Sequence, residues 1–275
     1  MTRLSLDPTP AKPYQSPVLD EDQLRVVNHR QGAMRVLAGP GTGKTTTLVA
    51  AMAARLTGPD ALAADQVLGL TFGRRAAIDW RDQVSAAVGG GVVPLVSTFH
   101  SLCYSLVSMF LSDDAYISAT RLLSGPEQQV RSRQLFADAI ADQRLDWPEE
   151  LMPAIGTRGL AEEIRAVMAR TRSHIMDPED LSALGRNTGL ATWSSIGVFM
   201  NEYLDVLDSE GVLDYPELIH RAVLLSHRPD VQDYLHKTFK AIYVDEYQDT
   251  DPGQVALLKA MVNADSSLVI VGDVD

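Results

Sequence analysis

The segment LAGPGTGKTTTL, residues 37–48, constrains the fold of this chain more than any other stretch. It joins an apolar run, MRVL, to a glycine-rich turn ending in Gly43-Lys44-Thr45, and residues rich in Ala, Leu and Met follow. A strand, a loop and a helix in this order direct backbone N–H groups, a helix N-terminus and a Lys ammonium toward nucleotide phosphates, while the Thr hydroxyl reaches a magnesium ion. The segment therefore predicts a phosphate-binding loop made of Ala38, Gly39, Pro40, Gly41, Thr42, Gly43, Lys44, Thr45 and Thr46.

The loop departs in one place from the pattern G-x-x-x-x-G-K-[ST], because Ala38 stands where the first glycine is expected. The glycines at 39, 41 and 43 still supply the backbone freedom that such a turn needs. A plain glycine-rich surface turn is the alternative interpretation. It does not explain why Lys44 and Thr45 follow the last glycine at the start of a helix.

Composition bounds the class of protein. The chain has 275 residues, of which 45% are hydrophobic and 22% charged, which is typical of one large globular domain or two smaller ones. It contains no apolar run of the roughly 18 residues that span a bilayer, and its N-terminus lacks a signal-peptide hydrophobic stretch. A single cysteine, Cys103, excludes an internal disulfide and fits a reducing compartment. We therefore expect no membrane association and a cytoplasmic location.

The formal net charge of −12 argues against extensive binding of nucleic acid through phosphates, which favours basic surfaces. It does not exclude such binding. One basic or aromatic groove can operate on an acidic surface, because base stacking needs little net charge.

Five short apolar runs predict buried parallel strands at residues 34–38, 67–71, 92–96, 241–244 and 268–271. Helical patterns follow the first three runs, at 45–55, 74–88 and 99–111. Before them, four prolines in the first 17 residues predict a flexible or extended lead-in over residues 1–18. A short helix is expected next, with Asp20 as N-cap and Gln23 in the capping-box position. The alternation of strands and helices predicts a doubly wound α/β fold.

Between residues 112 and 213 the pattern changes to helices without a convincing strand. The expected helices are 126–142, 159–174, 178–184 and 192–210, and two more, 216–225 and 230–238, lead back to the sheet. We therefore predict an all-α insertion, residues 112–213, between two parts of an α/β core, residues 19–111 and 214–275.

The run AIYVDEYQDT places Asp245 and Glu246 at the end of a predicted buried strand. A carboxylate there can hold magnesium, and an adjacent glutamate can deprotonate the water that attacks a γ-phosphate. Alone, such a pair is more often a strand end that meets solvent. Together with the loop it predicts Asp245 as a metal ligand and Glu246 as general base.

About 200 residues separate Lys44 from Asp245, far more than a βαβ unit of about 30 residues, and the helical insertion accounts for most of them.

Six segments of the chain form an ordered series: Gln23 in LDEDQ, AGPGTGKT, LTFGRRAA, VSTFHSL, VDEYQDT and VGDVD. They occur in the order found in UvrD/Rep-type helicases of superfamily 1, and the chain resembles the N-terminal motor domain of that family. In its GRRAA segment and its high alanine content, the chain is also similar to a helicase–nuclease subunit of the actinobacterial AdnA kind. The resemblance implies a RecA-like core and the cofactors ATP and Mg²⁺.

Within the family's motifs, Gln23 corresponds to the residue that reads adenine, and Gln248 to a sensor of the γ-phosphate that acts with Glu246 and Lys44 in catalysis. A helix-capping glutamine is the alternative for Gln23. Helix capping by itself explains Gln254. Trp80, Trp147 and Trp193 are expected to be packing residues, and the histidines show no metal-binding spacing.

The resemblance also implies contacts to DNA at the ends of the second and third strands. The candidates are Phe72, Arg74, Arg75, Thr98, Phe99 and His100. Phenylalanines beside strands are more often core residues, which is the alternative for Phe72 and Phe99. The segment LTFGRRAA also departs from the usual sequence of this family motif. A small polar residue and Asn-Lys are usual at the positions of Gly73, Arg74 and Arg75.

The expected activity is that of an ATP-dependent DNA helicase or translocase that moves 3′ to 5′ on single-stranded DNA or at a single/double-strand junction in repair or recombination. The alternatives are an ATP-dependent binding switch and the motor half of a helicase–nuclease subunit with a partner subunit. The chain ends inside the sixth motif, where the family continues into a second motor domain that supplies an arginine finger. We expect these 275 residues alone to bind ATP weakly, to hydrolyse it poorly and not to unwind DNA.

Overall fold

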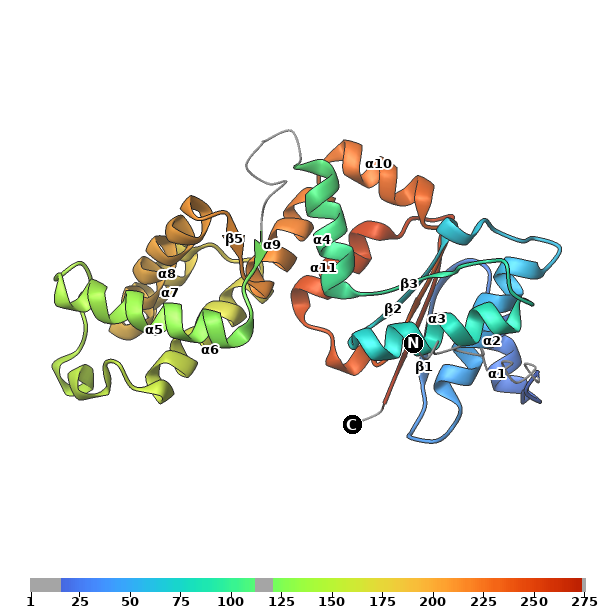
Figure 1. Ribbon diagram of the computed structural model, residues 1–275, viewed down its shortest axis with the longest axis horizontal. Coiled ribbons are helices and arrows are strands. Elements are labelled where there is room, and N and C mark those ends of the chain that lie inside the picture. The colour runs from blue at the N-terminus through green and yellow to red at the C-terminus, as the bar shows by residue number, and fades with distance from the viewer. Residues whose placement is uncertain (1–15, 112–120, 274–275) are drawn as a thin grey trace, which may run out of the picture. The chain divides into compact units, whose positions relative to one another are not determined.

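The computed structural model describes residues 16–111 and 121–273, and Figure 1 shows them coloured along the chain. The predicted lead-in, residues 1–18, lies almost wholly outside these residues. The described residues divide into two compact units. The sheet unit comprises the residues up to Thr98, Lys237–Asp249 and the residues from Asn263 onward. The helical unit comprises Phe99–His236, apart from residues 112–120, and Thr250–Val262.

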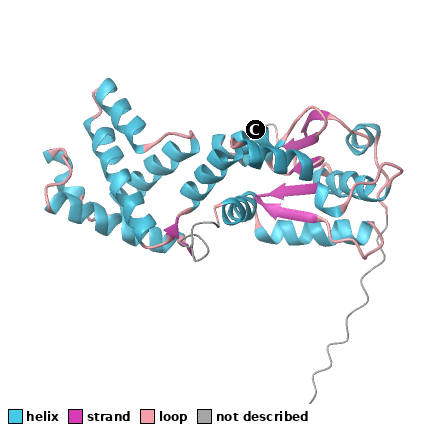
Figure 2. Ribbon diagram, turned by 90° about the horizontal axis from the view of Figure 1, so that it is seen from above, coloured by secondary structure: helices cyan, strands magenta, loops and turns pink. Residues whose placement is uncertain are grey.

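A parallel sheet of five strands forms the centre of the sheet unit. Figure 2, in which strands are magenta, shows this sheet with helices alongside it. The strands lie in the order β1 (Gly32–Leu37), β7 (Ser267–Gly272), β6 (Ala241–Val244), β2 (Val67–Thr71) and β3 (Leu95–Thr98). The α/β fold with a parallel sheet and flanking helices is thus confirmed.

Helices α1 (Glu21–Val27), α2 (Lys44–Thr57) and α3 (Arg74–Ala87) belong to the same unit. Helix α1 begins with the predicted capping box of Asp20 and Gln23. Helix α3 buries Ala77, Trp80 and Val84, one face of a helix. Trp80 and Val84 join a core that also contains Leu48, Met52, Tyr243 and Val269. Each fully buried Leu, Val or Met contributes roughly 1.5–3 kcal/mol to stability.

The helical unit contains a second core around α5 (Gly125–Ala141), α6 (Arg158–Ser173), α7 (Pro178–Thr188) and α8 (Ala191–Ser209). Phe136 and Phe199 meet there edge to face, with ring centroids 5.0 Å apart. Helices α4 (Phe99–Phe110), α9 (Tyr215–Ser226), α11 (Pro252–Met261) and most of α10 (Pro229–Thr238) also belong to this unit. It is therefore larger than the predicted insertion of residues 112–213, because α9 packs against α4, α6 and α11. No helix in the described ranges is long and apolar enough to cross a membrane.

Three local predictions were wrong. The third strand was expected at 92–96, but β3 spans Leu95–Thr98, because Pro94 has no N–H to donate to the ladder. The segment 112–213 was expected to hold no strand, yet β4 (Arg121–Leu122) pairs with β5 (Val212–Leu213). Strands of two residues carry no readable periodicity. Helix α7 continues beyond the predicted end to Thr188, where Gly189 adopts a left-handed cap with φ 73°.

Candidate functional site

The glycine-rich loop leaves the carboxyl end of β1 and turns directly into α2. Gly41 and Gly43 have φ values of 77° and 85°, in the left-handed region that favours glycine. The Thr42 hydroxyl donates to the Gly39 carbonyl oxygen over 2.8 Å, which closes the turn. Gly43 is the N-cap of α2 and offers no side-chain acceptor to the first N–H groups of the helix. The loop thus presents a helix N-terminus of the kind that binds phosphate.

The sheet order brings the carboxyl ends of β1, β7 and β6 next to one another. The Lys44 ammonium, on the loop after β1, forms an ion pair with Asp273, which follows β7. Its Nζ also lies 3.7 Å from Oε2 of Glu246, which follows β6. Strand β7, between β1 and β6, therefore contributes a carboxylate to the same site.

Asp245 directly follows β6, and the residue is buried, only 8% exposed. Burial raises the pKa of its carboxyl above the usual value, and the neighbouring Glu246 charge acts in the same direction. The Lys44 ammonium and a hydrogen bond with the Thr45 side chain lower that pKa and so oppose the shift. The structure thus brings together Asp245 and Thr45, the two residues predicted to hold a metal.

This donor set fits magnesium, which prefers oxygen ligands and is usually bound by one or two carboxylates together with water and phosphate. In residues 16–111 and 121–273, no group of three or more His, Cys, Asp or Glu side chains forms a metal cluster. A single buried carboxylate beside a hydroxyl is therefore suited to a metal ion that arrives with a nucleotide.

Glu246 has the left-handed φ of 52°, which is uncommon outside glycine. Its backbone N–H donates to Asp245 Oδ1 over 3.0 Å. The Gln248 amide nitrogen donates to Glu246 Oε2 over 2.7 Å, and Gln248 Oε1 accepts the Asp273 N–H over 3.0 Å. Gln248 thus connects the candidate general base to the end of β7.

Gln23 caps α1 and also contacts the phosphate-binding loop. Its Oε1 accepts the Asp20 N–H in the capping box, and its Nε2 donates to the Thr42 carbonyl oxygen over 3.3 Å. A cavity of about 330 Å³ lies between α1 and the loop, lined by Gln23, Gly39, Lys44 and neighbouring residues. Capping fixes the glutamine beside this cavity, and its contact with an adenine base stays a prediction.

Sequence reasoning missed the contact of Asp273 with Lys44. The signal was present, since VGDVD has an aspartate at the end of an apolar strand, as AIYVDE does. The sequence alone did not reveal that β7 lies between β1 and β6.

The candidate DNA contacts are divided between the two units. Phe72, Arg74 and Arg75 follow β2 in the sheet unit, where both arginines are exposed and Phe72 is half-buried. Thr98 ends β3 and is buried. Phe99 and His100 open α4 in the helical unit. Phe99 is only 1% exposed, which agrees with the alternative that it is a core residue.

Other residues singled out in the sequence have structural roles. Gln254 forms the expected capping box with Asp251. Trp80 belongs to the core of the sheet unit, and Trp147 and Trp193 pack against the core of the helical unit. Cys103 is buried, and burial raises the pKa of its thiol to about 12. The thiol therefore stays protonated at neutral pH.

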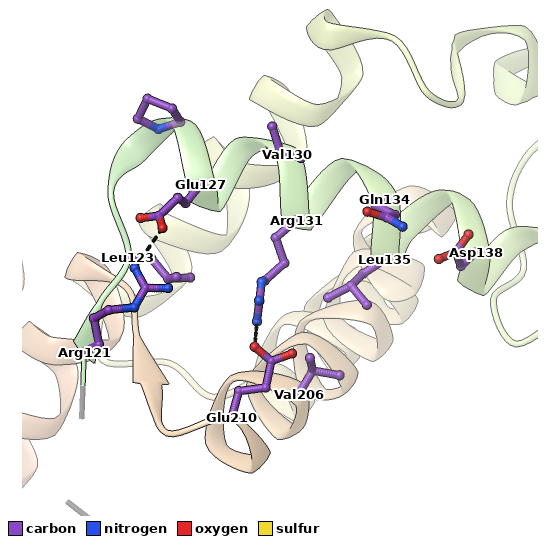
Figure 3. Close-up of a pocket in the computed structure, with 11 residues that line it drawn as sticks. Arg121, Leu123, Glu127, Val130, Arg131, Gln134, Leu135, Asp138, Val206 and Glu210 are labelled. Atoms are coloured by element: carbon purple, nitrogen blue, oxygen red, sulfur yellow. Dashed lines mark hydrogen bonds and ion pairs between the residues drawn. The ribbon is translucent and has the colours of Figure 1, made fainter. Parts of the chain in front are cut away.

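A separate cavity of about 600 Å³ lies in the helical unit between α5 and α8 (Figure 3). Its charged side chains pair with one another, Arg121 with Glu127 over 2.8 Å and Arg131 with Glu210. These ion pairs occupy the arginines and two of the carboxylates, so few charged groups of this cavity are left to bind a ligand.

Comparison with known proteins extends these observations. A model of the UvrD/REP helicase N-terminal domain matches residues 19–275. The chain is 29% identical over 267 residues to ATP-dependent DNA helicase UvrD1 of Mycobacterium tuberculosis, an alignment that covers 94% of this chain and 33% of that protein. It is 26% identical over 259 residues to ATP-dependent DNA helicase PcrA of Staphylococcus aureus, with the same coverage. The chain therefore spans about a third of the length of these relatives, and it belongs to the UvrD/REP helicase family as an N-terminal domain.

Proposed function

We propose that this chain is the ATP-binding motor part of a DNA helicase or translocase. The observation that carries the proposal is the convergence of Lys44, Asp245, Glu246 and Gln248 at the carboxyl ends of β1, β6 and β7. Ligands of open α/β sheets bind at this edge. The names of the relatives, both ATP-dependent DNA helicases, support the assignment.

Each side chain has a distinct role in the proposal. The loop N–H groups and the Lys44 ammonium hold the phosphates, and Thr45 and Asp245 hold the magnesium ion. Bound magnesium neutralises charge that develops on the phosphates during transfer. Glu246 orients and deprotonates the attacking water, and the Gln248 amide holds the Glu246 carboxylate in place.

The proposal extends to movement 3′ to 5′ along single-stranded DNA, to a cytoplasmic role in repair or recombination, and to further domains or a partner subunit that complete the ATP site. It rests here on the order of the family's motifs. Movement of a labelled single strand through the complete natural protein would test the direction.

Nucleotide binding to the chain tests the site itself. Lys44→Ala should weaken binding of a fluorescent Mg-ATP analogue about tenfold or more, since a hydrogen bond to a charged group contributes roughly 1.5–3 kcal/mol. Lys259→Ala, an exposed lysine on α11, is the matched control and should leave binding unchanged. Equal affinity of the Lys44 variant and the control would refute the assignment.

Hydrolysis in the complete natural protein tests the motor. Glu246→Gln should retain nucleotide binding and lower the DNA-stimulated rate by about 10²-fold or more, the usual contribution of a general base. If single-stranded DNA fails to stimulate hydrolysis by the unchanged protein, an ATP-dependent switch replaces the motor.

A further inference from the structure

The C-terminal end of α2 carries a buried arginine that the candidate ATP site does not use. Arg55 lies in the last turn of this helix and is only 8% exposed. Lys44 opens the same 14-residue helix, so the two residues lie roughly 16 Å apart along its axis. The surroundings of Arg55 are therefore distinct from the phosphate-binding loop.

Two polar atoms in these surroundings lack a partner. In the described part of the chain, Arg55 Nε and the Tyr243 hydroxyl oxygen are both buried and make no hydrogen bond. Tyr243 lies on β6, a strand against which α2 packs in the sheet unit. Unsatisfied buried polar atoms are rare in folded proteins, and they are most costly on a charged group. Each of these two atoms therefore requires a partner.

A second guanidinium acts on the same hydroxyl. Burial raises the pKa of Tyr243 to about 12, and the charges of Arg55 and Arg30 both oppose this rise. Burial lowers the pKa of Arg55; the Tyr243 hydroxyl opposes that shift, and the Arg30 charge adds to it. The hydroxyl thus keeps its proton at neutral pH, as the two guanidinium groups do. Three hydrogen-bond donors therefore lie within electrostatic reach of one another.

Stabilisation of the helix end does not explain why Arg55 is buried. A cation in the last turn of a helix interacts favourably with the helix dipole. However, the carbonyl groups there already have backbone partners. The Gly58 N–H donates to the Ala54 carbonyl oxygen over 3.0 Å, and the Leu62 N–H to the Arg55 carbonyl oxygen over 2.8 Å. An exposed arginine would serve the dipole without the cost of removing its charge from water.

The charges around Arg55 indicate the charge of its missing partner. Arg55 and Arg30 are positive, and the exposed Asp60, whose charge raises the pKa of Arg55, is negative. One further negative charge therefore balances this group. Arg30 is held in place, because its Nη1 donates to the carbonyl oxygens of Val27 and His29 over 2.7 and 3.1 Å. The group is thus suited to a single monovalent anion.

We infer that a monovalent anion of the size of chloride binds between Arg55, Arg30 and Tyr243. It accepts hydrogen bonds from Arg55 Nε and from the Tyr243 hydroxyl. Because both atoms are buried, a compact ion fits better than sulfate or phosphate, and a single charge costs less to remove from water than a double one. The ion connects α2 with β6, the elements that carry Lys44 and lead to Asp245. The inference does not depend on the proposed function.

Thermal melting of this chain in sodium chloride and in sodium gluconate, at one pH and constant ionic strength, tests the inference. Gluconate is too large for the buried position. Replacing it by about 0.2 M chloride should raise the melting temperature by about 2 °C or more, because an ion that binds only the folded chain stabilises it. Tyr243→Phe and Arg55→Met should lose most of this rise. Arg35→Met, an exposed arginine of β1, is the matched control and should keep it.

The NMR line of chloride gives a second readout that does not depend on stability. The line should broaden when the unchanged chain or Arg35→Met is added, and much less with Arg55→Met or Tyr243→Phe. Tyr243→Phe, which removes only a hydroxyl, decides the test if Arg55→Met does not fold. Lys44→Ala should keep both effects, because the phosphate-binding loop is a different anion site.

Three results would overturn the inference. Equal melting temperatures of the unchanged chain in the two salts would mean that water satisfies the donors. A full rise with Tyr243→Phe would place the anion elsewhere. Loss of both effects in Lys44→Ala alone would place it at the phosphate-binding loop, and the proposed function would then stand without this second site.

Discussion

At the scale of single residues, Asp245 shows a conflict between stability and function. Its carboxyl is buried, and burial raises its pKa above the usual value. The native carboxyl therefore keeps its proton to higher pH than the same group in the unfolded chain. In the unfolded chain the pKa of this carboxyl is about 3.8. As the pH rises past that pKa, the group's contribution to the free energy of unfolding falls, and at neutral pH the ionised group opposes folding.

Asp245→Asn should consequently raise the melting temperature of the chain at neutral pH, and the gain should shrink near about pH 4, where the unfolded carboxyl also begins to hold its proton. The same variant should lose the magnesium-dependent part of nucleotide binding. Differential scanning fluorimetry across pH measures the first effect, with the exposed Asp249→Asn as control. A variant that melts below the unchanged chain at neutral pH would contradict this account.

The backbone of Glu246 is in the left-handed region, with φ 52°. Glycine adopts this conformation without the steric penalty that a Cβ brings. Glu246→Gly should therefore be more stable than Glu246→Ala by about 1 kcal/mol, although both lose hydrolysis. Urea unfolding of the two variants compares them directly. Equal midpoints would show that the conformation carries no strain.

At the scale of elements, hydrogen bonds at Asp214 anchor the start of α9 in the helical unit. Asp214 is buried and accepts hydrogen bonds from the Glu217 N–H, the Tyr203 hydroxyl and the Gln128 amide. Asp214→Ala should destabilise the chain by about 2 kcal/mol or more, since it removes a cap and leaves buried polar groups without an acceptor. Thr157→Ala, which removes the exposed cap of α6, is the control and should cost about 1 kcal/mol. Urea unfolding gives both values, and equal losses would show that burial adds nothing to the cap.

Elements were predictable where local chemistry determined them. Strands β2 and β6 lie where their apolar runs predicted, because each run is buried on both faces of the sheet. Strand β3 shifted because one proline removed a donor, and β4 and β5 were missed because pairing over two residues depends on where distant segments meet.

The same limit applies to the site. The loop glycines, Lys44 and Thr45 follow from a local pattern, and Asp245 and Glu246 from a strand end. Asp273 meets Lys44 only because β7 lies between β1 and β6, and strand order is not a local property.

At the scale of the whole molecule, the use of its arginines bears on what the acidic chain can bind. Most arginines of α6 form ion pairs or hydrogen bonds with glutamate or glutamine side chains, so their charge is used in contacts within the fold. A net charge of −12 therefore argues against extensive binding through phosphates at the proposed DNA contacts.

The short ladder of β4 and β5 has a consequence for how this chain can change. The Arg121 N–H donates to the Gly211 carbonyl oxygen and the Leu123 N–H to the Leu213 carbonyl oxygen, over 3.1 and 2.8 Å. The two ends of the intervening segment are therefore hydrogen-bonded neighbours on two short strands that run parallel. Residues can be added or removed between them without moving the points where the segment leaves and rejoins the rest of the chain. Length variation among relatives, and the fusion of a reporter domain, should be best tolerated in the loops of this segment.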